Sequence, residues 1–122
     1  MKKQLVIWVD DMRNPFDDAW ISVAKNKRFV QENCSIAWLK NYQEFVSWLN
    51  TAVHDPEVLW PELVCFDHDL GEEKTGFDCA KILVEVCMKH NLPLPAYTCH
   101  SSNPAGRENI LSYLNSYKKS LE

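Results

Sequence analysis

One stretch of the chain, Leu63 to Gly71 (LVCFDHDLG), limits most strongly what the chain can fold into. It opens with four apolar residues, a run too short for a helix and apolar enough for a fully buried strand. The polarity then changes abruptly at Asp67, His68 and Asp69, and Gly71 permits a sharp turn. Open α/β sheets bind their ligands at the carboxyl ends of such strands. The pattern therefore indicates either a ligand site made of two carboxylates and an imidazole, or acids that only cap a loop or a helix.

A second apolar run, Leu5 to Val9 (LVIWV), also ends in acidic residues, Asp10 and Asp11. Strands that are apolar on both faces are typical of a parallel sheet covered by helices. Neighbouring parallel strands would bring Asp10, Asp11 and Asp67 together at one edge of the sheet. Carboxylates so close together need a compensating cation, and hard cations such as magnesium prefer carboxylate oxygens. We therefore expect a metal site here rather than a solvated turn.

Three segments have the apolar spacing of amphipathic helices. The first follows Asn41 as N-cap and ends at His54, before Asp55 and Pro56. The second follows Thr75 and ends near His90, and the third starts at Asn103 and Pro104. The predicted buried face of the first helix is Tyr42, Phe45, Val46, Leu49 and Val53. That of the second is Cys79, Ile82, Leu83, Val86 and Cys87, and that of the third is Ile110, Leu111, Leu114, Tyr117 and Leu121.

Two more short segments have the character of strands. Ser35 to Leu39 is the first, and Leu94 to Cys99 is the second, with Pro95 favouring an edge position. The region from Phe16 to Asn33 fits a helix loosely and a strand equally well, so its structure stays open. Strands alternating with helices predict one α/β domain over residues 1–122.

Polar residues also follow the last predicted strand. His100 stands at the strand end, where it is a candidate general acid, general base or hydrogen-bond donor to a phosphate. Ser101 and Asn103 lie beside the free amides of the next helix, whose first turn includes Gly106. Such a helix start can bind phosphate, although a capped helix without a ligand has the same sequence pattern.

Composition narrows the choice of partners. A net charge of −4 argues against a broad nucleic-acid surface, but a bound divalent cation would still allow a small phosphate-bearing substrate. No apolar run is long enough to cross a bilayer, and no secretory signal pattern is evident. The five cysteines form no Cys-x-x-Cys pair, so we expect reduced core thiols in a cytoplasmic protein. Nothing in the sequence indicates an oligomeric state.

The order strand–Asp–Asp, strand–Asp and then a glycine that opens a helix resembles response-regulator receiver domains. In these domains the paired acids hold magnesium and the central Asp accepts a phosphoryl group, roles that fall by position on Asp10 and Asp11 and on Asp67. The resemblance implies a flavodoxin-like, three-layer sandwich with a parallel sheet of about four strands in the order 2-1-3-4. The chain departs from ordinary receivers because it has no Lys-Pro and only one helix after Gly106, so a fifth strand and helix are missing.

A divergent group, the cyclic-phosphate processing receiver domains, is a closer match. The similarity covers nearly the whole chain and is carried by Asp10-Asp11-Met12-Arg13, Asp67-His68-Asp69-Leu70-Gly71, Thr75-Gly76 and His100-Ser101-Ser102-Asn103-Pro104-Ala105-Gly106-Arg107. The family implies a role in handling cyclic phosphates, such as 2′,3′-cyclic phosphates of nucleotides or RNA ends in RNA repair.

The first hypothesis is a metal-dependent phosphoesterase. Carboxylates would hold Mg²⁺ or Mn²⁺, the histidines would transfer protons, and the remaining residues would hold the phosphate. The expected metal ligands are Asp10, Asp11, Asp67 and Asp69. The expected proton-transfer residues are His68 and His100, and the expected phosphate-binding residues are Arg13, Ser101, Asn103 and Gly106. Asp67 could attack the phosphorus directly or only bind the metal.

The second hypothesis is a signalling or phosphate-sensing module, in which the same pocket changes a partner surface without turnover. The third is a scaffold with a vestigial site. The missing Lys-Pro weighs against an ordinary phosphorylation switch, and His68 and His100 favour chemistry over signalling.

Overall fold

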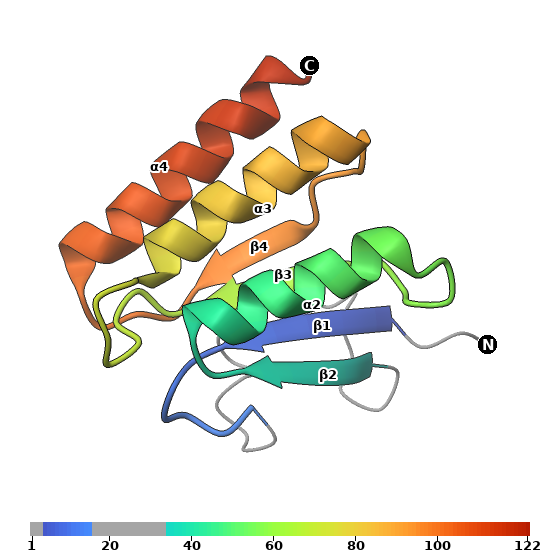
Figure 1. The fold of residues 1–122 in the computed structure, drawn as a ribbon. Helices are drawn as coiled ribbons and strands as arrows, with labels where there is room; N and C mark the ends of the chain where they lie inside the picture. The colour runs from blue at the N-terminus through green and yellow to red at the C-terminus, as the bar shows by residue number, and fades with distance from the viewer. Residues whose placement is uncertain (1–3, 16–33) are drawn as a thin grey trace.

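The computed structural model describes residues 4–15 and 34–122 (Figure 1). Its strands form one parallel sheet in the order β2-β1-β3-β4, which confirms the predicted strand number and order. The elements are β1 (Gln4–Val9), β2 (Cys34–Leu39), α2 (Tyr42–His54), β3 (Leu63–Phe66), α3 (Gly76–His90), β4 (Ala96–Cys99) and α4 (Pro104–Ser120).

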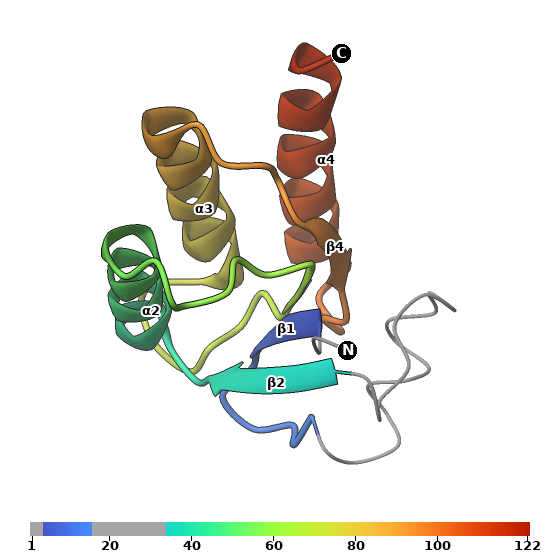
Figure 2. The same ribbon diagram turned by 90° about the vertical axis from the view of Figure 1, so that its right-hand side faces the viewer.

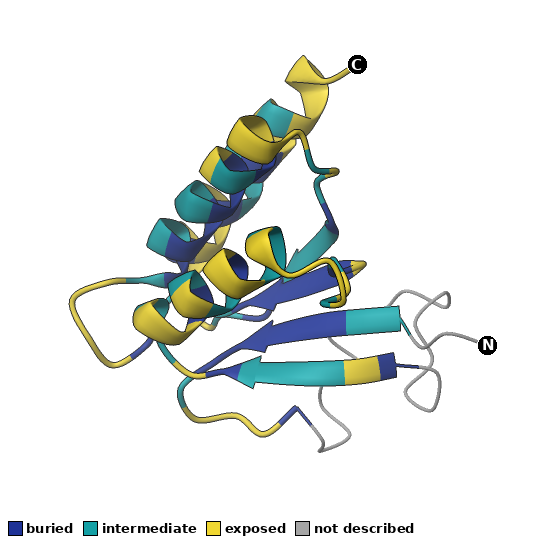
Figure 3. Ribbon diagram, turned by 45° about the vertical axis from the view of Figure 1, so that its right-hand side comes forward, coloured by how far each residue is buried: buried dark blue, intermediate teal, exposed yellow. Residues whose placement is uncertain are grey.

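All three described helices cover the same face of the sheet, with α3 between α2 and α4 (Figure 2). Residues of alternate sheet positions, such as Ile7, Val9, Val64 and Phe66, form the main core with the buried stripes of the helices. Figure 3 shows these buried stripes facing inward and the exposed stripes facing outward.

The opposite face of the sheet carries a second, smaller apolar cluster. Val6, Trp8, Cys34, Leu63 and Cys65 form it, and all five are buried. The third layer expected on this face, and the structure of Phe16 to Asn33, fall outside the described residues. The described chain contains no helix that is long and apolar enough to cross a membrane.

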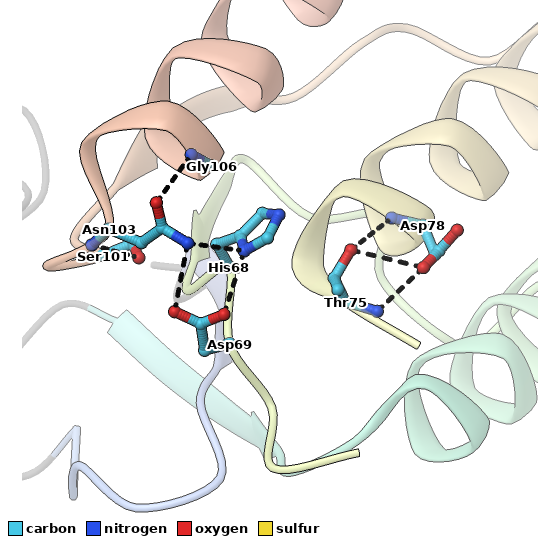
Figure 4. A network of polar contacts seen from close by, with 7 residues as sticks. All are labelled: His68, Asp69, Thr75, Asp78, Ser101, Asn103 and Gly106. Carbon is cyan, nitrogen blue, oxygen red and sulfur yellow. Dashed lines mark hydrogen bonds and ion pairs between the residues drawn. The ribbon is translucent and has the colours of Figure 1, made fainter. Parts of the chain in front are cut away.

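The helix starts follow the capping rules as predicted. The Asn41 side chain accepts a hydrogen bond from the Glu44 amide at 2.8 Å, and Asn103 accepts one from the Gly106 amide at 3.1 Å. Thr75 and Asp78 form a reciprocal capping box before α3 (Figure 4). These caps fix where each loop at the carboxyl edge of the sheet ends.

The register of the sheet decides which polar residues meet. Val9, Phe66 and Cys99 lie side by side on β1, β3 and β4. The pairing continues one residue further, since the Asp67 amide donates to the Val9 carbonyl at 3.0 Å and the His100 amide to the Phe66 carbonyl at 2.9 Å. Asp10, Asp67 and His100 therefore form the next row across the sheet.

All five cysteines are buried and free, as predicted for core thiols. Burial raises the pKa of the Cys65 and Cys79 thiols to about 12, which keeps them protonated and unreactive at neutral pH.

Candidate functional site

A compact group of ionisable side chains occupies the carboxyl edge of the sheet. Asp10, Asp67 and His100 each offer a ligand atom, and these atoms lie within 4.8 Å of one another. Asp10 and His100 are buried, and Asp67 is half-buried. Within the part of the chain that the structure describes, this is the one group of three or more such residues that could hold a metal ion.

Asp10 is held by hydrogen bonds to both of its carboxylate oxygens. Its Oδ1 accepts from the amides of Met12 at 2.9 Å and Arg13 at 2.8 Å, and its Oδ2 lies 2.8 Å from His100 Nε2. Burial by itself would raise the pKa of Asp10, but the hydrogen bonds from His100 and the two amides outweigh it and lower the pKa. Asp10 is therefore a fixed negative charge, although only 1% of its surface is exposed.

His100 is fixed on three sides. Its ring stacks on Trp8, with centroids 4.0 Å apart and planes 6° from parallel. Its carbonyl oxygen accepts a hydrogen bond from Arg13 Nη1 at 2.6 Å, and its Nε2 faces Asp10. The other ring nitrogen, Nδ1, is buried without a hydrogen-bond partner among the described residues. The imidazole is therefore well placed in the group but not fully satisfied by protein atoms.

The pKa of Asp67 is raised, whereas that of Asp10 is lowered. Burial raises the pKa of Asp67, and the negative charge of Asp10 raises it further, against the weaker lowering effects of His100, Arg13 and Ser101. A cation between the two carboxylates would relieve this repulsion. The donor set of two carboxylates and one imidazole thus fits a divalent metal.

A second polar network lies at the start of α4 (Figure 4). Its side chains are more exposed, with 17% for His68 and 64% for Asp69. His68 Nδ1 lies 3.1 Å from Asp69 Oδ1, and the Asn103 side-chain amide lies 3.5 Å from both residues. The His68 ring packs directly on Gly106, where a Cβ atom would lie 2.2 Å from the ring's Cγ. Asn103 therefore caps α4 and contacts His68 with the same side chain.

Of the residues expected at the site, the structure brings Asp10, Asp67 and His100 together in one group but leaves others outside it. Asp11 lies outside the buried group, with its Oδ2 2.8 Å from where a Cβ on Gly71 would be. Asp69 faces His68 instead of that group. The Gly106 amide is already bonded to Asn103, so phosphate could reach it only if this cap opened. Ser101 Oγ accepts a hydrogen bond from the Asn103 amide at 3.1 Å.

Two tryptophans at the site were not expected from the sequence. Trp8 Nε1 donates to the Arg13 carbonyl at 2.9 Å, and Trp38 Nε1 donates to the Asp10 carbonyl at 2.7 Å. Both residues lie within apolar strand patterns, which indicate core positions only. The pattern contains no signal for what an indole N–H at a strand end will contact.

Two solved structures of response regulators are similar to this chain. The bacteriophytochrome response regulator AtBRR superimposes with a TM-score of 0.61 at 18% identity, over 93% of this chain and 77% of that one. The phosphorylated cyanobacterial phytochrome response regulator RcpA gives a TM-score of 0.47 at 14% identity, over 98% of this chain and 96% of that one. At such identities the first match establishes the receiver fold alone. No curated protein matches the chain.

A comparison with sequence families identifies the chain more closely than the fold does. A family model described as the cyclic-phosphate processing receiver domain matches residues 5–116, which include the whole buried group and the network at α4. The chain therefore belongs to the family of cyclic-phosphate processing receiver domains.

Proposed function

We propose that this protein is a metal-dependent phosphoesterase that opens cyclic phosphates, with 2′,3′-cyclic phosphates of nucleotides or RNA ends as substrates. The observation that carries the proposal is the convergence of Asp10, Asp67 and His100 within 4.8 Å at the carboxyl edge of the sheet. The family supports the substrate class.

Asp10 and Asp67 would hold the cation, with His100 either as a third ligand or as the group that orients Asp10. Carboxylates suit Mg²⁺ and Mn²⁺, whereas a ligating imidazole would favour Mn²⁺ over Mg²⁺. When bound, such a cation polarises the phosphate and lowers the pKa of a bound water. Asp11 lies outside the group, and we assign it no ligand role.

Arg13 and Ser101 are the groups that would bind the phosphate. One guanidinium nitrogen of Arg13 is anchored on the His100 carbonyl, and within the described residues its other donors remain for phosphate oxygens. The Arg13 side chain thus approaches the group from β1 while Ser101 approaches from β4. A phosphate between them would lie beside both carboxylates, so its charge requires the cation.

His68 is the group that would exchange a proton with the substrate. Its Nδ1 is directed toward Asp69, which leaves Nε2 for an ester oxygen. The side chain of His68 is 17% exposed, so a substrate can reach it, whereas the ring of His100 is enclosed. The two histidines would therefore have different roles, proton transfer for His68, and metal ligation or orientation of Asp10 for His100.

Phosphorus NMR with a 2′,3′-cyclic nucleotide, with and without Mn²⁺ or Mg²⁺, tests this function. We expect metal-dependent conversion of the cyclic signal to a monoester, abolished by Asp67→Asn. The position of the monoester identifies which ester bond opens. No conversion by the wild-type protein with either metal would refute the esterase.

A sensing or signalling module without turnover is the second candidate. Asp67 follows the central strand β3 in a receiver fold, and the solved structures that match are response regulators. Under this alternative a small phosphodonor would add a stable phosphoryl group to Asp67, measured as an added mass that Asp67→Asn removes. Turnover of a cyclic phosphate without such an adduct would exclude the alternative.

A further inference from the structure

The segment Asp10–Arg13 is tied at both ends by tryptophan indoles. Trp38, on β2, donates its Nε1–H to the carbonyl of the first residue, and Trp8, on β1, donates to the carbonyl of the last, at 2.7 Å and 2.9 Å. Inside the segment, the amides of Met12 and Arg13 both donate to Asp10 Oδ1. Every one of these bonds keeps the segment in the same tight turn.

This turn would not stay ordered through packing alone. Met12 is 82% exposed, and Arg13 is also exposed, so little apolar burial offsets the conformational entropy of the segment. The two indoles, in contrast, belong to rigid strands, and Trp8 is almost fully buried. Their hydrogen bonds hold the exposed turn in a fixed position against the ordered sheet.

The same turn completes the buried group. It places the Arg13 guanidinium on the His100 carbonyl, and the face of Trp8 supports the His100 ring. If the turn loosened, Asp10 Oδ1 would lose its two amides, and Arg13 would lose its anchor. Both changes would disturb Asp10 and Arg13, whose charges act on Asp67.

We propose that Trp8 and Trp38 are positioning residues of the site, whose indole N–H groups hold the Asp10–Arg13 segment in the conformation that binds metal and phosphate. The proposal rests on the proposed function for its effect on turnover, but its structural part is independent of any ligand. Neither indole is assigned a contact with substrate.

The chain offers a matched control for the loss of an indole hydrogen bond. Trp60 Nε1 donates to the Pro93 carbonyl at 2.7 Å, in a loop that contributes no residue to the site. Trp→Phe removes the N–H and keeps an aromatic ring in each case. Trp38→Phe is the lead variant because Trp38 is only half-buried, and Trp8→Phe is the second.

The first measurement is hydrogen exchange of the Met12 and Arg13 amides, each compared with β3 amides in the same sample to remove any global change in stability. We expect about fivefold faster exchange of both amides in Trp38→Phe and Trp8→Phe, the effect of one lost hydrogen bond. Trp60→Phe should leave both rates unchanged. Equal rates in all four proteins would overturn the proposal.

The second measurement is the affinity for Mn²⁺ alone, by titration calorimetry well below the unfolding temperature. We expect about fivefold weaker binding in the two site variants and unchanged binding in Trp60→Phe. If the wild type bound no Mn²⁺, the proposed function would fail while the exchange result still decided the role of the indoles. Faster exchange with unchanged Mn²⁺ affinity would refute positioning of the metal site.

Discussion

The two halves of the site are built in different ways. The buried half, Asp10, Asp67 and His100, follows three neighbouring strands, and the Asp10 side chain accepts hydrogen bonds of 2.8 to 2.9 Å. The exposed half, His68, Asp69 and Asn103, lies on a loop and a helix cap, and the contacts among its side chains are longer, at 3.1 to 3.5 Å. The Asp69 side chain is 64% exposed, whereas Asp10 is almost completely enclosed.

This difference leads us to expect different roles for the two halves of the site. Fixed charges in a buried group are suited to holding a cation and a phosphate, because no reorganisation is needed when the ligand arrives. A histidine on a looser, accessible network is suited to proton exchange with a substrate that enters and leaves. We therefore expect changes in the buried half to affect metal binding and stability, and changes in the exposed half to affect turnover.

The largest expected effect comes from Asp67→Asn, compared with Asp69→Asn. Asp67→Asn should abolish both turnover and the rise in melting temperature caused by Mn²⁺, because the amide cannot replace an anionic ligand. Asp69→Asn should keep the Mn²⁺-dependent rise and reduce turnover, since Asp69 contacts His68 instead of the buried group. Thermal unfolding with Mn²⁺ and with a chelator measures this. Loss of the metal response in Asp69→Asn would show that Asp69 is a metal ligand after all.

Stability should distinguish the two histidines. His100→Ala leaves the buried Asp10 carboxylate without its partner and should lower the free energy of unfolding by about 3 kcal/mol or more. His68→Ala removes a partly exposed contact and should cost less than about 1 kcal/mol. Urea unfolding provides both values. Adding Asp10→Asn to His100→Ala should recover part of the loss, and an additive result would contradict the pairing.

Two glycines allow a smaller change in each half. A Cβ on Gly76 would lie 1.8 Å from the Asp67 carbonyl oxygen, so Gly76→Ala must move the backbone of Asp67, one of the proposed metal ligands. We expect a loss of about 2 kcal/mol in unfolding free energy and weaker Mn²⁺ binding.

Gly106→Ala would instead displace the His68 ring, a side chain that can move. The gain of about 1 kcal/mol from alanine in a helix should offset much of the clash, and Mn²⁺ affinity should stay unchanged. Urea unfolding and calorimetry of both variants make the comparison. Equal losses of Mn²⁺ affinity would show that the two halves are not separable.

The smallest expected effect is on the pH dependence of stability in the absence of metal. The pKa of Asp67 is raised above the ordinary 3.8 by burial and by Asp10, so its ionisation costs stability as the pH rises above 3.8. Asp67→Asn should therefore raise the melting temperature at neutral pH and lose this advantage below pH 3.8.

Asp10 should show the opposite sign. Its pKa is lowered, so its contribution is fully present above pH 3.8 and is lost as the pH falls through the lower, folded-state value. Asp10→Asn should therefore lower the melting temperature at neutral pH. Melting curves of both variants and the wild type between acidic and neutral pH test the two signs, and slopes of the same sign would contradict this balance.

Much of the fold follows from local patterns in the sequence. The apolar runs that end in acid at Asp10 and Asp67 predict the central strands β1 and β3, and the caps at Asn41, Thr75 and Asn103 predict where the helices begin. These signals are readable because hydrophobic period and capping depend on residues that are close in sequence. The strand order came from the resemblance to receiver domains, and the sheet confirms it.

The pairings within the site depend instead on tertiary structure. Consecutive residues after a strand point in different directions, so the pair Asp10 and Asp11 cannot both enter the row that the sheet register defines. Register places His100 in that row, next to Asp67 and 90 residues from Asp10. The sequence by itself thus determined which residues stand at the strand ends. The register of the strands and the two indoles decided which of them meet, because those contacts join positions with no local signal between them.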